Sequence, residues 1–196
     1  PPAIVSVYLG GEIEAIVNCI IEGVEYDGVK VSKMHTGVNV LPDFKMDSAD
    51  RNRTSPFAFT GNKFEFRMLG SSMSVSTANV ILNTITADVI REFADRLENC
   101  ADFDTEVNAI LKETFTAHSR IIFSGNNYSE DWVEEAKRRG LLNLRSTVDV
   151  LPYFASDKNI EFFERNKIFT GKELHARSEI AYENYVKTVN IEANTM

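Results

Sequence analysis

The chain has 196 residues, with 21 basic and 29 acidic side chains and a formal net charge of −8. This length is enough for one domain, or slightly more, with a sizeable core. The acidic balance argues against nucleic acid and membrane surfaces as partners, since both are polyanionic. Two cysteines, Cys19 and Cys100, are too few for a disulfide framework, and we therefore expect a cytoplasmic protein.

Both ends of the chain suggest that it is part of a longer protein. It begins at Pro1-Pro2 with neither an initiator methionine nor a charged and then apolar leader. It stops at Met196 directly after a helical pattern. No apolar run reaches the roughly 20 residues that a bilayer span needs.

The first half of the chain indicates short strands joined by polar loops. Residues 3–9 are apolar and β-branched, which predicts a strand that ends at Gly10-Gly11. Isoleucines at helical spacing then predict a helix that stops near Gly23. Residues 28–60 have no sustained period and are expected to be rich in loops. Residues 63–69 alternate as a strand does.

The second half indicates successive helices. We expect one over residues 79–99, with an apolar face formed by Val80, Ile81, Ile85, Val89, Phe93 and Leu97, and another from about Val107 to Ile122. Ser129 and Gly140 are typical of the start and end of a third helix, whose final Lys137-Arg138-Arg139 we expect to be solvated. Pro152 interrupts a fourth pattern, and Thr170 opens a capping box for a fifth. Trp132 is expected in the core. The fold class predicted is α+β, with strands followed by a helical layer.

The alternating segment carries the strongest candidate for chemistry. Phe64, Phe66 and Met68 are expected on one face of the strand, and Lys63, Glu65 and Arg67 on the other. Glu65 offers the hard oxygen ligand that Mg²⁺ prefers. Arg67, together with Arg51 and Arg53 upstream, offers planar guanidinium groups that match carboxylate and phosphate oxygens. The same spacing also suits a half-exposed strand with cross-strand ion pairs on its outer face, and it does not decide between the two interpretations.

This region resembles glutamine synthetases, and more closely their type III branch. The run Asn52-Arg53-Thr54-Ser55-Pro56, followed by Asn62-Lys63-Phe64-Glu65-Phe66-Arg67, is similar to the family's Asn-Arg-Ser and Arg-x-Glu-x-Arg signature. The start of the chain, residues 123–129 and residues 185–196 also resemble type III sequence. Residues 10–49 resemble an insertion of that branch.

The resemblance implies a role for each residue of the motif. Glu65 would bind Mg²⁺ or Mn²⁺ next to the phosphates of ATP, and Arg67 would contact the substrate glutamate. Arg51 and Arg53 would hold carboxylate or phosphate oxygens, with the division of roles between them left open. Lys63, like Arg53, would lie on the nucleotide side.

The implied function is ATP-dependent ligation of ammonia to glutamate through a γ-glutamyl phosphate, within a double-ring homo-oligomer. The resemblance implies a curved, mostly antiparallel sheet. It assigns residues 1–100 to the catalytic domain and residues 101–196 to a helical region. The upstream part of the site is missing, so we expect this chain alone to be inactive. Two alternatives are kept: a non-catalytic binding or assembly module, and a related carboxylate–amine ligase that uses another amine.

Overall fold

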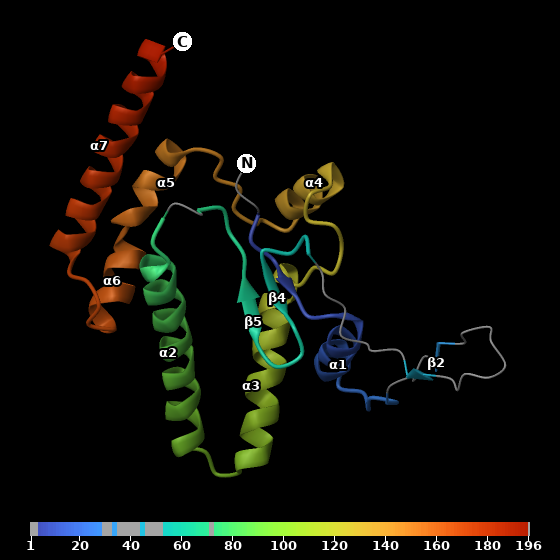
Figure 1. Ribbon diagram of the computed structural model, residues 1–196. Helices are drawn as coiled ribbons and strands as arrows, with labels where there is room; N and C mark the ends of the chain where they lie inside the picture. Colours follow the sequence, from blue (N-terminus) through green and yellow to red (C-terminus); the bar gives the residue numbers. More distant parts are fainter. Residues whose placement is uncertain (1–3, 29–32, 35–43, 46–52, 71–72, 196) are drawn as a thin grey trace. The chain divides into compact units, whose positions relative to one another are not determined.

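A computed structural model describes five segments of the chain (Figure 1): residues 4–28, 33–34, 44–45, 53–70 and 73–195. These segments form two compact units, and each unit combines parts that are distant in sequence. One, here called the strand unit, comprises Ala3–Leu69 and Cys100–Asn143. The other, the helical unit, comprises Pro1–Pro2, Gly70–Asn99 and Leu144–Met196. The predicted α+β class is confirmed, with helices predominating. The domain boundary expected near residue 100 stays a prediction.

A small sheet lies in the strand unit. Strand β1 (Val7–Tyr8) pairs in parallel with β4 (Phe57–Phe59), and β4 pairs antiparallel with β5 (Phe64–Phe66). The strand expected over residues 3–9 therefore extends only over Val7–Tyr8 within its described part. The strand expected over residues 63–69 is shortened in the same way to β5.

The loop-rich prediction for residues 28–60 missed the short strands within that range. Besides β4, it contains β2 (Lys33–Met34) and β3 (Phe44–Lys45), which pair with each other in antiparallel fashion. Two or three residues are too few to give a recognisable alternation. Pairing with other strands, rather than local pattern, establishes these strands.

Local capping residues set the helix ends of the strand unit. Helix α1 (Gly11–Glu22) stops at Gly23, which has the left-handed φ of 73° that glycine adopts without strain. Helix α3 (Phe103–His118) gives way to the 3-10 turn η1 (Ser119–Ile121), so the expected helix ends before Ile122. Helix α4 (Glu130–Arg138) begins as predicted at Ser129, whose side chain accepts a hydrogen bond from the Trp132 backbone N–H.

The core of the strand unit forms around Trp132. This side chain is 1% exposed, as expected from the sequence, and clusters with Ile4 and Ala136. The Phe123 ring stacks on the Trp132 indole with centroids 3.9 Å apart. A Cβ added to Gly125 would lie 2.4 Å from Cζ of Phe123, so the chain can pass this ring only at a glycine.

The prediction that the end of α4 is solvated is wrong for Arg139. Its Nη1 donates a 2.8 Å hydrogen bond to the Ile122 carbonyl, and its guanidinium carbon lies 5.8 Å from the ring centroids of both Phe123 and Trp132. The stem of an arginine can cover apolar surface while its charged end finds polar partners. Arg138, by contrast, keeps the predicted exposure, with 75% of its side chain accessible.

The helical unit contains α2 (Ser76–Glu98), α5 (Thr147–Phe154), α6 (Asp157–Arg165) and α7 (Gly171–Thr195). Helix α7 packs on α5 and α6, and its Leu174 is 3% exposed. The capping box at Thr170 is confirmed, since Thr170 and Glu173 exchange hydrogen bonds between side chain and backbone. Pro152 lies inside α5, which continues for two further residues before it ends.

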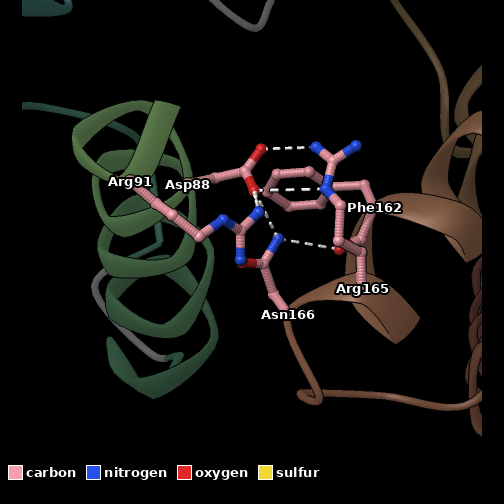
Figure 2. Close-up of polar contacts among 5 residues, drawn as sticks. All are labelled: Asp88, Arg91, Phe162, Arg165 and Asn166. Carbon is pink, nitrogen blue, oxygen red and sulfur yellow. Dashed lines mark hydrogen bonds and ion pairs between the residues drawn. The ribbon is translucent and has the colours of Figure 1, made fainter. Parts of the chain in front are cut away.

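Helix α2 buries polar rather than apolar side chains. Of the six residues expected to form its apolar face, Val80, Ile81, Ile85 and Val89 are exposed, whereas Thr84 and Asp88 are buried. Figure 2 shows the reason: the Asp88 carboxylate accepts hydrogen bonds from Arg91, Arg165 and Asn166. The hydrogen bond from Arg165 is the main cause that lowers the pKa of Asp88, and burial opposes it. A network of charges thus joins α2 to the end of α6.

We predict that Gly125→Ala destabilises the strand unit. The new methyl group must displace a ring that is stacked on Trp132, and overpacking of this kind typically lowers the free energy of unfolding by about 1–3 kcal/mol. Denaturant unfolding of the chain measures the change. Gly11→Ala is the matched control, because no atom lies within 4 Å of its added Cβ. Equal unfolding free energies for the two variants would contradict the close contact.

We also predict that Asp88→Asn lowers the midpoint of thermal unfolding by a few degrees at neutral pH. The pKa of Asp88 is lowered in the folded state, so its stabilisation is present above the ordinary value of 3.8. It is lost as the pH falls through the lower folded-state pKa. The difference in the midpoint of thermal unfolding between the native chain and the variant should therefore become smaller in acid. Far-ultraviolet circular dichroism can follow both unfolding transitions. Asp95→Asn, on the exposed side of the same helix, should produce no such difference.

Candidate functional site

The β4–β5 hairpin places the predicted charged residues on one side of a strand. Glu65 lies directly opposite Ala58, which is 1% exposed, so the two share a face of the sheet. Phe64 and Phe66 pack against β4 through Phe57, with ring centroids 5.1 and 6.1 Å apart respectively. The alternation expected for this segment therefore holds within β5.

Two of the three charged residues are more buried than the phenylalanines of the opposite face. Glu65 and Arg67 are half-buried, whereas Phe64 and Phe66 are exposed; Lys63, at the start of the charged row, is exposed as well. The buried position of Ala58 explains this, because its cross-strand partner must face the same interior. An ordinary amphipathic strand would show the opposite distribution.

The three predicted charges contact one another along the strand. Arg67 donates two hydrogen bonds to Oε2 of Glu65, from Nη2 at 2.8 Å and from Nε at 3.2 Å. Lys63 Nζ lies 3.8 Å from Oε1 of the same carboxylate. These ion pairs run between positions two apart on the same strand. The result is a carboxylate with cations on both sides, one of which is half-buried and held in a fixed orientation.

Glu65 suits a divalent cation as one ligand among several. Its oxygens are of the hard type that Mg²⁺ and Mn²⁺ accept, but such ions need several ligands. Within the described segments, no group of three or more His, Cys, Asp and Glu side chains is arranged to hold a metal ion. A metal site at Glu65 therefore requires further ligands from beyond these segments.

The upstream arginines are placed only in part. Arg51 lies outside the described residues. Arg53 is exposed at the start of the segment that leads into β4. Its two successors are less accessible: Thr54 is half-buried and Ser55 is 1% exposed. The segment that carries Arg53 is thus fixed from one side by the residues that follow it.

A set of buried polar side chains that the sequence did not single out holds this segment. The Asn127 backbone N–H donates a 3.2 Å hydrogen bond to Oγ1 of Thr54. The Asn127 side chain donates in turn to the hydroxyl of Ser6 at 2.6 Å. Ser6 is fully buried and Asn127 is 7% exposed. Apart from the N-cap at Ser129, the sequence marks residues 123–129 only through the family resemblance, because single serines and asparagines carry no periodic signal.

The similarity to known proteins extends beyond this motif to the whole chain. Residues 106–196 match the family model of the glutamine synthetase C-terminal domain. Across its full length, the chain is 46% identical to a protein named type-3 glutamine synthetase from Dictyostelium discoideum. It is also 40% and 36% identical to proteins named glutamine synthetase from Butyrivibrio fibrisolvens and Bacteroides fragilis.

These alignments cover all of the present chain but only 27% to 28% of each relative. The chain thus spans little more than a quarter of the length of the curated proteins that it matches. The family model covers the helices from α3 onward, whereas the Arg53 and Glu65 motif lies in the part that only the relatives cover. The motif resemblance and these two matches agree: the chain is similar over its full length to proteins named glutamine synthetase, and residues 106–196 match the C-terminal domain of that family.

Proposed function

We propose that this chain is part of an ATP-dependent glutamate–ammonia ligase of type III that uses Mg²⁺ or Mn²⁺. The observation that carries the proposal is the 46% identity over the entire chain to a protein named type-3 glutamine synthetase. Two further relatives with the corresponding name support it.

The proposed reaction has two steps. A γ-carboxylate oxygen of glutamate attacks the terminal phosphorus of ATP, which releases ADP and forms γ-glutamyl phosphate. Ammonia then attacks the acyl carbon of the γ-glutamyl phosphate, phosphate leaves, and the nitrogen loses a proton to give glutamine. Such transfers need little covalent help from the protein, and they depend on positioning and on stabilisation of charge.

The geometry of β5 suits these demands. Two hydrogen bonds to Glu65 fix the Arg67 guanidinium, so little side-chain freedom remains to be lost when it contacts the substrate glutamate. Glu65 would supply one metal ligand, and the bound metal would neutralise charge on the phosphates. Lys63, with 66% of its side chain exposed, remains free to reach the nucleotide side. Arg53 and Arg51 would hold carboxylate or phosphate oxygens.

The wider architecture belongs to the same proposal. In the order β1-β4-β5, strand β5 is at one edge. We infer that further antiparallel strands of the full-length protein continue the sheet there into a curved catalytic sheet. Covering an edge strand with further strands is one way in which proteins protect a sheet edge. A double-ring homo-oligomer in the cytoplasm completes the proposal. No helix in the described segments is long and apolar enough to cross a membrane.

We predict that Arg67→Ala in the full-length protein lowers glutamine formation by about 10²–10³-fold, the typical cost of a lost charge-stabilising donor. Coupled release of ADP measures the rate. Circular dichroism and size-exclusion chromatography should show an unchanged fold and assembly. Arg145→Ala, an exposed arginine of the other unit, is the control and should retain full turnover. Normal turnover of the Arg67 variant would favour a non-catalytic assembly module instead.

We further predict that the 196-residue chain alone forms no glutamine from glutamate, ammonia and ATP. Glu65 is the one metal ligand proposed here, and the described residues contain no group of three or more potential ligands that could hold a metal ion. Parallel assays of the chain and of the full-length protein, each supplied with Mg²⁺, test this expectation. Glutamine or γ-glutamyl phosphate formed by the purified chain would refute it.

A further inference from the structure

We propose that Thr54 is a positioning residue that fixes the backbone of Arg53 against the loop formed by residues 123–129. The inference rests on the proposed function, in which Arg53 holds carboxylate or phosphate oxygens. It goes further by assigning a role to a residue that makes no contact with substrate. It also links the motif to the loop that connects η1 to α4.

The contact is made through a single hydroxyl group. Oγ1 of Thr54 accepts from the backbone N–H of Asn127 at 3.2 Å and donates a long hydrogen bond of 3.5 Å to the Gly125 carbonyl. One hydroxyl thus meets a donor and an acceptor on the same loop, as a half-buried hydroxyl requires. These contacts join residues more than 70 positions apart in the sequence.

The loop itself is anchored firmly enough to serve as a reference. The side chain of Asn127 bonds to Ser6, whose burial excludes competition from water. The Phe123 backbone N–H donates a 3.0 Å hydrogen bond to the Val7 carbonyl on β1. The Phe123 ring lies between Gly125 and Trp132. Position and direction of the loop are therefore set by the sheet and the core together.

Retention of Asn127 carries a cost that the loop tolerates. Its Oδ1 is buried and has no hydrogen-bond partner in the described structure. A buried acceptor without a partner is unfavourable, because it has given up its hydrogen bonds to water. A smaller side chain at this position would avoid that cost but would lose the bond to Ser6. Asn127 thus fixes the loop to Ser6, although its own Oδ1 lacks a partner in the described structure.

Arg53 depends on this support because it is exposed. Packing does not hold an exposed side chain in one direction, so the backbone that carries it determines where its guanidinium can reach. The Thr54 hydroxyl fixes the adjacent residue, and the buried Ser55 extends the fixed stretch toward β4. Displacement of an arginine by about 1 Å is enough to impair the transfer of charged groups.

A double-mutant cycle in the full-length protein tests the proposal. Thr54→Val removes the hydroxyl and keeps the shape, and we expect it to lower kcat/KM by about tenfold, within the usual range of coupled residues. Thr54→Ser keeps the hydroxyl and should restore nearly full kcat/KM. In an Arg53→Ala background, Thr54→Val should have little further effect. Thr116→Val removes a hydroxyl that bonds only within α3, and is the control expected to leave kcat/KM unchanged.

The result of this cycle separates positioning from a purely structural role. If Thr54→Val costs as much without Arg53 as with it, the two residues act independently and the inference is overturned. If Arg53→Ala itself leaves turnover intact, then Arg53 has no role to be positioned for, and the inference fails as well.

A second measurement is independent of turnover. Hydrogen exchange of the Asn127 amide and of the amides at residues 53–57 should accelerate in Thr54→Val but not in Thr54→Ser. Unchanged exchange would overturn the inference even in an active enzyme. If the full-length protein shows no ligase activity while exchange accelerates, then the proposed function fails, but the support of the Arg53 segment by Thr54 stands.

Discussion

The buried hydrogen bond between Asn127 and Ser6 is the constraint on which the strand unit depends. It joins two residues 121 positions apart and has almost no access to water. From this fixed point the loop extends in two directions. Toward its start, Phe123 bonds to β1 and stacks on Trp132. Toward its end, Ser129 caps α4 and so sets where Trp132 enters the core. A local change in this loop would therefore affect both sheet and helix.

The candidate site takes its character from burial of the charged face of β5. A carboxylate removed partly from water interacts more strongly with its cations than an exposed one does. Glu65 and Arg67 are held in this setting because Ala58 occupies the opposite position on β4. The phenylalanines of the same hairpin are left more accessible. Burial of hydrophobic side chains alone would produce the opposite distribution. Half-buried charged side chains of this kind are typical of a site that binds charged groups.

The helical unit follows a different principle. One of the two buried positions on α2 is an aspartate surrounded by two arginines and an asparagine, rather than an isoleucine. A buried carboxylate is tolerated only where several donors satisfy it. This network gives α2 and α6 a specific register, because the groups must meet at hydrogen-bond distances. Packing of apolar side chains would restrict the register of the two helices less strongly. On α2 the apolar Val80, Ile81, Ile85 and Val89 are exposed, whereas Phe93 and Leu97 are half-buried.

The sequence alone determined features that arise from neighbouring residues. Gly23, Ser129 and Thr170 mark helix ends because capping involves contacts within three or four positions. The sequence also predicted the alternation of residues 64–66 and contained the family motif around Glu65. Strand β4, the network at Asp88 and the support of Thr54 were not, because each joins residues that the chain brings together only on folding. The tertiary structure alone decided which face of β5 is buried and which residue holds Arg53. The periodicity of a sequence predicts which residues share a face of a helix or strand. Only packing against distant segments determines which residues that face contacts.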